Sequence, residues 1–192
     1  MPKLGMEPIR RAALIDATIA EIGAAGSLDV TVGRIAKRAG MSSGLAHHYF
    51  GGKDDILLAA MHHVLAIYGR EARARLAGQT DPWARVTAIV EAGFAPSNFD
   101  ADTVAAWLNF YVLALSSPEA KRLHRIYAAR IRSNLVHALR PLAGPRAPEI
   151  AGRAAQLIDG AYLYHGLSPE APDAARAIRD VMTAIRADIG AI

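Results

Sequence analysis

Short and hydrogen-bonding side chains gather between residues 43 and 48, in a segment that also carries several cations. The positions expected to face outward there are Ser43, Gly44, His47 and His48. Groups of this kind can approach the edges of base pairs in a DNA groove, whereas an ordinary solvent-facing helix would carry Glu and Lys. The nearby cations are Arg34, Lys37, Arg38 and Lys53, which could meet phosphates on either side of the groove.

Two short helices joined by a tight turn are needed to present these side chains. Thr31 is a good cap for a first helix, and Gly40 stands where a helix can end in the left-handed region. Ser42 can cap a second helix that runs to about Phe50. This order is typical of a DNA-binding helix-turn-helix, although an ordinary αα-hairpin has the same outline.

Positive charge is concentrated in the same part of the chain. Residues 1–53 hold seven Lys or Arg against four Asp or Glu, whereas the other 139 residues hold fifteen against fourteen. The N-terminal part therefore carries +3 of the net charge of +4, as a polyanion-binding segment requires.

The rest of the chain shows helical periodicity throughout. After an arm at 1–6, a helix from about 8 to 24 is expected to end at Gly23 and Gly26. The later helices are expected at about 53–77, 82–95, 101–115, 118–142, 148–166 and 171–189. We therefore predict an all-α fold with a three-helix head (residues 1–52) and a helical body (53–192). The last two helices are so apolar that a second copy of the chain is the natural partner.

Aromatic residues are the other group that could bind a ligand. Nine of the twelve follow residue 80. Trp107, Phe110 and Tyr111 share one helix face, because they stand at i, i+3 and i+4. An aromatic cluster with this spacing can be plain core. It can also hold a quaternary ammonium ion, which aromatic faces attract. Asp159 or Glu91 could then supply a counter-charge.

Several functional classes find no support in the sequence. There is no cysteine, so disulfides, thiolate catalysis and Cys-based metal sites are excluded. The histidine pairs 47–48 and 62–63 are adjacent, and neighbouring helical residues diverge too much to chelate one metal. Without catalytic motifs we expect neither enzyme activity nor a cofactor. Without a secretory signal or an apolar run of about 18 residues, we expect a cytoplasmic protein that does not enter membranes.

The head resembles the TetR family of one-component transcriptional repressors. The matching residues are Thr31-x-x-x-Ile35-Ala36-x-x-Ala39-Gly40-Met41-Ser42-x-Gly44 and His48-Tyr49-Phe50-x-x-Lys53. The resemblance implies a homodimer that binds a palindromic operator. It places Ser43, Gly44 and His47 at base edges and Thr31, Ser42, Tyr49 and Lys53 at phosphates. His48 could contact DNA or pack against the following helix.

Stretches over most of the chain are similar to the choline-responsive branch of that family, the repressors of glycine betaine synthesis. They lie at residues 1–6, 9–11, 14–18, 106–110, 132–135 and 157–160. This implies choline as the effector, in a pocket that would include Trp107, Phe110, Tyr111, Tyr127, Asp159 and Tyr162. After Gly160 the chain departs from the branch, with Ala-Tyr-Leu-Tyr-His in place of Leu-Trp-Leu-Arg. A different small hydrophobic or cationic ligand is therefore the alternative.

Overall fold

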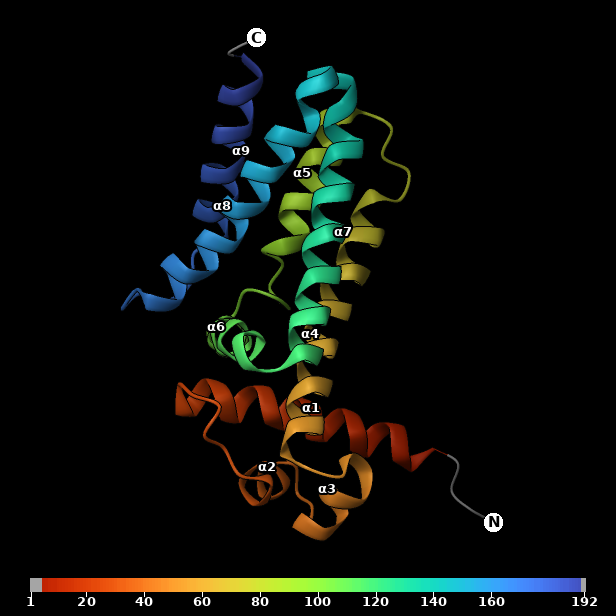
Figure 1. Cartoon of the computed structure of the whole chain (residues 1–192), viewed down its shortest axis with the longest axis vertical. Coiled ribbons are helices and arrows are strands. Elements are labelled where there is room, and N and C mark those ends of the chain that lie inside the picture. Colours follow the sequence, from red (N-terminus) through yellow and green to blue (C-terminus); the bar gives the residue numbers. More distant parts are fainter. Residues whose placement is uncertain (1–4, 191–192) are drawn as a thin grey trace.

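A computed structural model describes residues 5–190 of the chain, and helices make up all of its regular structure there (Figure 1). The helices are α1 (Met6–Ala25), α2 (Val32–Arg38), α3 (Ser43–Phe50), α4 (Lys53–Leu76), α5 (Pro82–Gly93), α6 (Ala101–Ser116), α7 (Pro118–Ala143), α8 (Ala147–Leu167) and α9 (Ala174–Gly190), with a 3-10 turn at Gly144–Arg146. The expected all-α fold is confirmed. Residues 1–4 of the expected arm lie outside the described part.

The turn between α2 and α3 has the predicted geometry. The hydroxyl of Thr31 accepts a hydrogen bond from the Arg34 amide, and that of Ser42 accepts one from the Leu45 amide, both at 3.2 Å. Gly40 has a φ of +66°, which a residue without Cβ adopts readily. Each helix of the pair is therefore capped by the side chain of the residue that immediately precedes it.

The first helix ends differently from the prediction. Gly26, with a φ of +61°, ends α1, but Gly23 is an interior residue of that helix. A Cβ built on Gly23 would lie 2.8 Å from the Cα of Asp102 on α6 and would also overlap its carboxylate. Gly23 is thus required for the close approach of α1 and α6, which a local sequence pattern cannot reveal.

The body rises from this head as an elongated bundle (Figure 1). α4 leaves the helix-turn-helix and packs against α5 and α7, while α8 lies between α7 and α9. α7 continues through Pro141, and α9 begins three residues later than predicted. Asp173 causes that delay, because its carboxylate accepts a hydrogen bond of 2.9 Å from the Arg176 amide and caps the helix.

One continuous apolar core runs through head and body. It already includes most of the apolar residues on the last two helices that were expected to need a second copy. These are Ile150, Ala154, Ile158, Val181, Met182 and Ile185. The large apolar side chains that stay exposed on α8 are Leu157, Leu163, Tyr164 and Leu167. Within residues 5–190, no helix has both the length and the apolarity needed to cross a membrane.

Candidate nucleic-acid interface and aromatic cluster

The outer face of α3 lies at the end of the molecule farthest from the body (Figure 1). Its exposed residues are Ser43, Gly44, His47 and His48, as predicted, while Ala46 and Phe50 are buried beneath them. His48 is exposed, and its ring lies 5.5 Å from the ring of Tyr49. Small residues in the first turn leave the backbone of α3 open to close approach by a ligand.

His47 is held in one orientation by its own helix end. Its Nδ1 lies 2.8 Å from the carbonyl oxygen of Gly51. A carbonyl can only accept a hydrogen bond, so Nδ1 carries the proton and Nε2 is an acceptor in the neutral ring. The exposed Nε2 is then suited to the amino group of adenine or cytosine in a major groove.

The C-terminal end of α3 is fixed to α1 by two arginines whose partners the sequence did not indicate. Arg10 donates a hydrogen bond of 3.3 Å to the Tyr49 hydroxyl. Arg11 donates to the Tyr49 carbonyl, and its guanidinium lies 4.2 Å from the centre of the Phe50 ring. A cation at this end stabilises a helix dipole. The Tyr49 hydroxyl and Arg10 together form a pair of donors suited to one phosphate.

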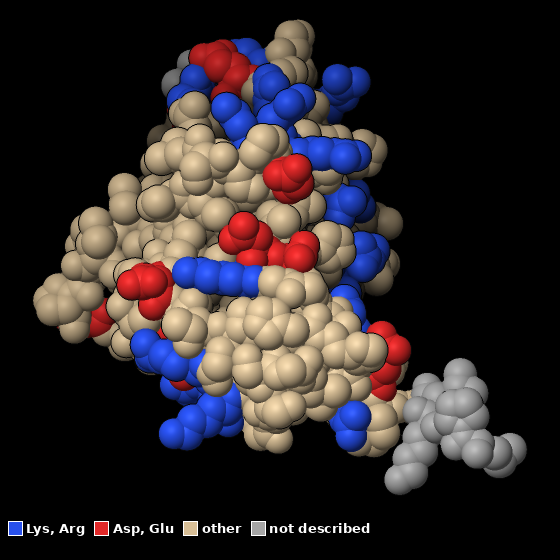
Figure 2. Space-filling view, turned by 60° about the horizontal axis from the view of Figure 1, so that its bottom comes forward, with Lys and Arg blue, Asp and Glu red and all other residues tan. Residues whose placement is uncertain are grey.

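Glu21 holds the cations of α2 in place. Its carboxylate, buried in α1, forms ion pairs with Arg38 at 2.6 Å and with Arg34 at 2.9 Å. The Arg38 hydrogen bond lowers the pKa of Glu21 below its ordinary value. Both guanidinium groups stay about half exposed, so they can still meet phosphates. Figure 2 shows Lys and Arg gathered at the lower left edge, on the side where α2 lies in Figure 1.

Three more of the predicted phosphate contacts lie around the same turn. The hydroxyls of Thr31 and Ser42 use a lone pair for capping, so each O–H remains free to donate to a phosphate. Lys53 is half-buried at the first position of α4. All nine predicted DNA-contact residues therefore lie on or next to the helix-turn-helix.

Trp107 is the centre of the aromatic cluster in the body. Its ring lies 5.0 Å from Tyr127, 5.7 Å from Tyr111, 5.9 Å from Tyr162 and 6.5 Å from Phe110, measured between ring centres. α6, α7 and α8 supply these rings. All are buried except Tyr111, which is half-buried. The structure thus brings together the five aromatic residues predicted for a pocket.

Asp159 is the carboxylate that stands beside this cluster. Its Oδ1 accepts a hydrogen bond of 3.0 Å from the Tyr111 hydroxyl. Burial raises the pKa of Asp159 above its ordinary value, and the Tyr111 hydrogen bond opposes that shift. Burial also raises the pKa of Tyr111 and of Tyr127, so both hydroxyls stay neutral. Glu91, the other predicted counter-charge, instead pairs with Arg75 at 3.2 Å and is not needed here.

Further rings extend the cluster beyond the predicted set. Phe99 lies 5.0 Å from Tyr162 and 5.3 Å from His165, and Tyr68 lies 5.3 Å from Tyr127. The Tyr162 hydroxyl donates to the carbonyls of Gly93 and Asn98, so it ties α8 to the end of α5. Periodicity along one helix could not indicate these neighbours, because each comes from a different helix or loop.

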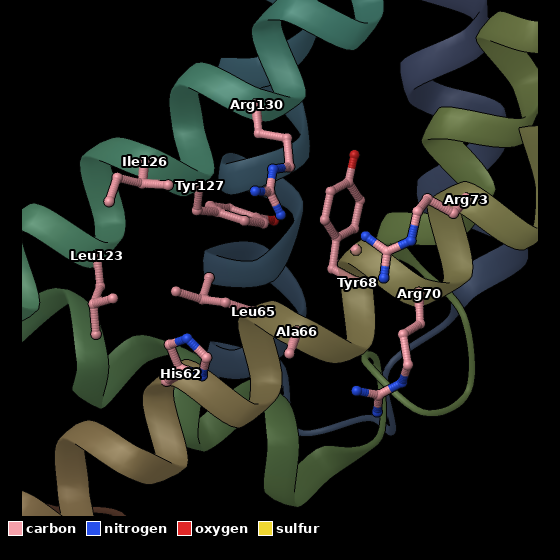
Figure 3. A pocket seen from close by; sticks show the side chains of 11 residues that line it. His62, Leu65, Ala66, Tyr68, Arg70, Arg73, Leu123, Ile126, Tyr127 and Arg130 are labelled. Atoms are coloured by element: carbon pink, nitrogen blue, oxygen red, sulfur yellow. The ribbon is translucent and has the colours of Figure 1, made fainter.

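A cavity of about 340 Å³ adjoins the cluster between α4 and α7 (Figure 3). Tyr127 belongs to both, since it lines the cavity and also meets Trp107.

Comparison with known families gives two matches that together cover most of the chain. A family described as "Bacterial regulatory proteins, tetR family" matches residues 14–60. A second family, described as "BetI-type transcriptional repressor, C-terminal", matches residues 82–190.

Individual proteins agree with these family matches. The HTH-type transcriptional regulator BetI of Brucella melitensis is 53% identical over 179 residues, which cover 93% of this chain and 90% of that protein. The regulator of the same name from Agrobacterium fabrum is 49% identical over 87% of this chain and 82% of its own length.

Solved structures show the same fold. A transcriptional regulator from Pseudomonas aeruginosa PAO1 superposes with a TM-score of 0.81 at 26% identity, covering 98% of this chain and 93% of its own. A regulator from Saccharomonospora viridis in complex with choline has a TM-score of 0.80 at 20% identity, covering 92% of this chain and 95% of its own.

Proposed function

This chain belongs to the TetR family of transcriptional repressors, in its BetI-type branch, and we propose that it is a dimeric repressor of genes for converting choline to glycine betaine. Choline is its effector in this proposal. Residues 1–52 bind the operator, and residues 53–192 bind choline and the second copy. Such a protein acts on chromosomal DNA and therefore works in the cytoplasm.

The α3 face supports the DNA-binding part of the proposal. Ser43, Gly44 and His47 are exposed where a recognition helix would meet base edges. Thr31, Ser42, Tyr49 and Lys53 surround this face with phosphate-binding groups, and Arg34 adds a charge that Glu21 positions. His48 is exposed beside Tyr49, which favours a DNA contact over packing against α4.

The single observation that carries the choline assignment is the set of four rings around Trp107 with Asp159 beside them. A quaternary ammonium ion donates no classical hydrogen bond and is held by aromatic faces and a nearby negative charge. Both are present here, since Asp159 lies 3.0 Å from Tyr111, which in turn packs on Trp107. The choline complex of the Saccharomonospora viridis regulator, which shares the fold, adds support.

The exposed apolar residues of α8 support dimerisation. Leu163, Tyr164 and Leu167 are 53%, 57% and 73% exposed, and Leu157, six to ten residues earlier on the same helix, is 44% exposed. Apolar side chains at helical spacing on one face are costly to leave in water. A second copy that covers them would place two heads on successive half-sites of a palindromic operator, roughly 34 Å apart.

Coupling between the two sites runs through α6 in this proposal. Trp107 lies five residues, or about 7.5 Å along the helix, from Asp102, which contacts Gly23 of the head. A ligand that moves α6 therefore also moves α1, to which Arg10 and Arg11 attach α3. Choline would weaken operator binding if it binds more tightly to the dimer arrangement whose head separation does not match the operator. The ratio of its affinities for the two arrangements sets how far operator affinity can fall.

The test is a fluorescence-anisotropy titration of DNA from upstream of the chain's own gene, at one fixed salt concentration. We expect specific binding that weakens in choline and does not weaken in 3,3-dimethyl-1-butanol, the neutral isostere of choline. His47→Ala should lose specificity, whereas His137→Ala, an exposed histidine on α7, should bind like the wild type. Specific binding that responds equally to both alcohols would overturn the choline assignment and favour a different hydrophobic ligand.

A further inference from the structure

We propose that the cavity between α4 and α7 is a second ligand site, one that binds a small organic carboxylate. In this proposal the guanidinium groups of Arg73 and Arg130 hold the charged end, and the apolar body lies on Tyr68 and Tyr127. The site is separate from the choline pocket, and the proposal does not depend on choline being the effector.

The shape and walls of the cavity suit a small amphipathic molecule. Its volume of about 340 Å³ falls within the range of small-molecule sites. Tyr68 and Tyr127, both buried, form its floor (Figure 3). Apolar walls come from both helices; they are Leu65, Ala66, Leu123 and Ile126. Most of the surface of an apolar ligand group placed here would therefore be removed from contact with water.

The charge at the cavity is wholly positive. Arg70, Arg73 and Arg130 line it, and no Asp or Glu does so among the described residues. None of the three forms an ion pair with a carboxylate in the part of the chain between residues 5 and 190. The nearby carboxylates Glu71 and Glu91 are instead paired with Arg75. Uncompensated cations beside an apolar cavity favour an anion.

Two of these arginines lie close to each other. A Cβ built on Gly69 would lie 3.5 Å from an Nη1 atom of Arg73 and 3.5 Å from an Nη1 atom of Arg130. The two nitrogens are therefore within about 7 Å of each other, a separation at which like charges repel. A carboxylate within reach of both guanidinium groups would relieve the repulsion and could accept hydrogen bonds from them.

Tyr68 supplies a further hydroxyl, which has the Asn134 side chain as its neighbour but no partner at normal hydrogen-bond geometry. Its hydroxyl is buried and makes no hydrogen bond of normal geometry with any described residue. Burial raises the pKa of Tyr68 to about 12, while a hydrogen-bonding contact with the Asn134 side chain and the charge of Arg130 oppose the shift. The hydroxyl is thus a neutral donor beside Arg130, and Figure 3 shows the Tyr68 ring standing between the arginine side chains. Leaving a buried donor without a well-aligned partner is costly, and a carboxylate could pair with it once the side chains that cover it move aside.

The same charges exclude choline from this cavity. A quaternary ammonium ion here would meet three arginines and no carboxylate, whereas beside Trp107 it meets Asp159. Tyr127 links the two sites, since its ring lies 5.3 Å from Tyr68 of the cavity and 5.0 Å from Trp107 of the cluster. The chain would therefore hold a cation and an anion next to the same tyrosine ring.

The test uses benzoate and hexanoate as probes, with benzamide as the neutral match for benzoate and choline as the cation. Isothermal titration calorimetry is performed on the full chain at constant pH and ionic strength. We expect saturable binding of at least one carboxylate at one site per chain. The affinity for benzamide should be lower by a factor of about ten or more, because benzamide cannot form charge-assisted hydrogen bonds.

Two variants locate the site and one controls for general charge effects. Arg130→Gln should weaken carboxylate binding about tenfold or more, and Tyr68→Phe should weaken it less. Arg132→Gln, at a likewise exposed arginine of α7 that does not line the cavity, should bind like the wild type. Choline affinity should be the same in Arg130→Gln as in the wild type.

Three results would overturn the proposal. They are no saturable binding of either carboxylate to the wild type, equal binding of benzoate and benzamide, and benzoate affinity unchanged by Arg130→Gln. A failure of choline to bind leaves these comparisons intact, so the two proposals fail separately.

Discussion

Replacing Gly23 by alanine tests whether the contact between α1 and α6 sets the position of the DNA-binding head. The new Cβ would lie 2.8 Å from the Cα of Asp102 and would also meet its carboxylate. A backbone atom cannot rotate away as a flexible side chain can. The two helices must therefore separate by roughly 0.6 to 1 Å before this contact becomes ordinary.

The energetic effect has two opposing parts. Overpacking of a tight contact costs about 1–3 kcal/mol. Alanine in a helix interior recovers roughly 0.5–1 kcal/mol of the backbone entropy that glycine loses. We therefore expect a net loss of about 1–2 kcal/mol in the free energy of unfolding. For a chain of 192 residues this corresponds to a fall in Tm of roughly 2–8 °C.

Thermal unfolding and operator titration of the same protein samples measure both consequences. Gly23→Ala should lower Tm and should also weaken operator binding, because α1 carries the arginines that hold α3. Gly152→Ala is the matched control, since no atom lies within 4 Å of a Cβ built at that position on α8. It should leave operator affinity unchanged and raise Tm slightly. If Gly23→Ala behaved like Gly152→Ala in both measurements, the reasoning would be wrong.

Three further substitutions test the other contacts. Glu21→Gln should lower the free energy of unfolding at pH 7 by roughly 1–3 kcal/mol, since Arg34 and Arg38 lose a buried partner. Because the fold lowers the pKa of Glu21, its contribution is present above the ordinary value of 4.5 and is lost as pH falls through the folded pKa. The difference from the wild type should therefore shrink in acid; a constant difference down to pH 3 would contradict this. Asp159→Asn should weaken choline binding about tenfold without lowering Tm at pH 7, because burial raises the pKa of Asp159 and its ionised form costs stability above that pKa. Calorimetry and thermal unfolding check both parts, and a large fall in Tm would refute the second. Tyr162→Phe should cost about 1–2 kcal/mol in chemical unfolding, because two buried carbonyls lose their shared donor; an unchanged unfolding midpoint would show that this hydroxyl is dispensable.

Local features of the head were predictable from the sequence. The caps at Thr31 and Ser42, the left-handed Gly40 and the outward set on α3 depend on residues at most a few positions apart. Such short-range preferences act whatever the rest of the chain does. The sequence was therefore sufficient to outline the helix-turn-helix and the residues expected at DNA.

Long-range partners were not predictable in the same way. Arg11 meets Tyr49 across 38 positions and Glu21 meets Arg38 across 17, and neither spacing follows from helical periodicity. Glycine often ends a helix, but Gly23 lies inside α1, where the absence of a side chain allows close contact with α6. These roles depend on how whole helices pack, which only the folded structure reveals.

The apolar stripes of the last helices show a related limit. Periodicity indicates that a face is buried but not whether its partner is in the same chain. Ile158 and Val181 bury within the chain, whereas Leu163 and Leu167 stay exposed, although all four are aliphatic. The distinction comes from the packing of α8: α7 and α9 cover one part of its surface and leave the rest exposed.

The position of α1 has a consequence for how the molecule folds. This helix contributes Leu14 and Ile22 to the continuous core and packs against both α4 and α6. A chain cut after residue 52 would expose that face to water, so residues 1–52 are not expected to fold independently of the body. Head and body are then expected to melt in one cooperative transition. A substitution that destabilises the body would therefore also lower the fraction of molecules able to bind DNA, even if the substituted residue lies far from the DNA-facing surface.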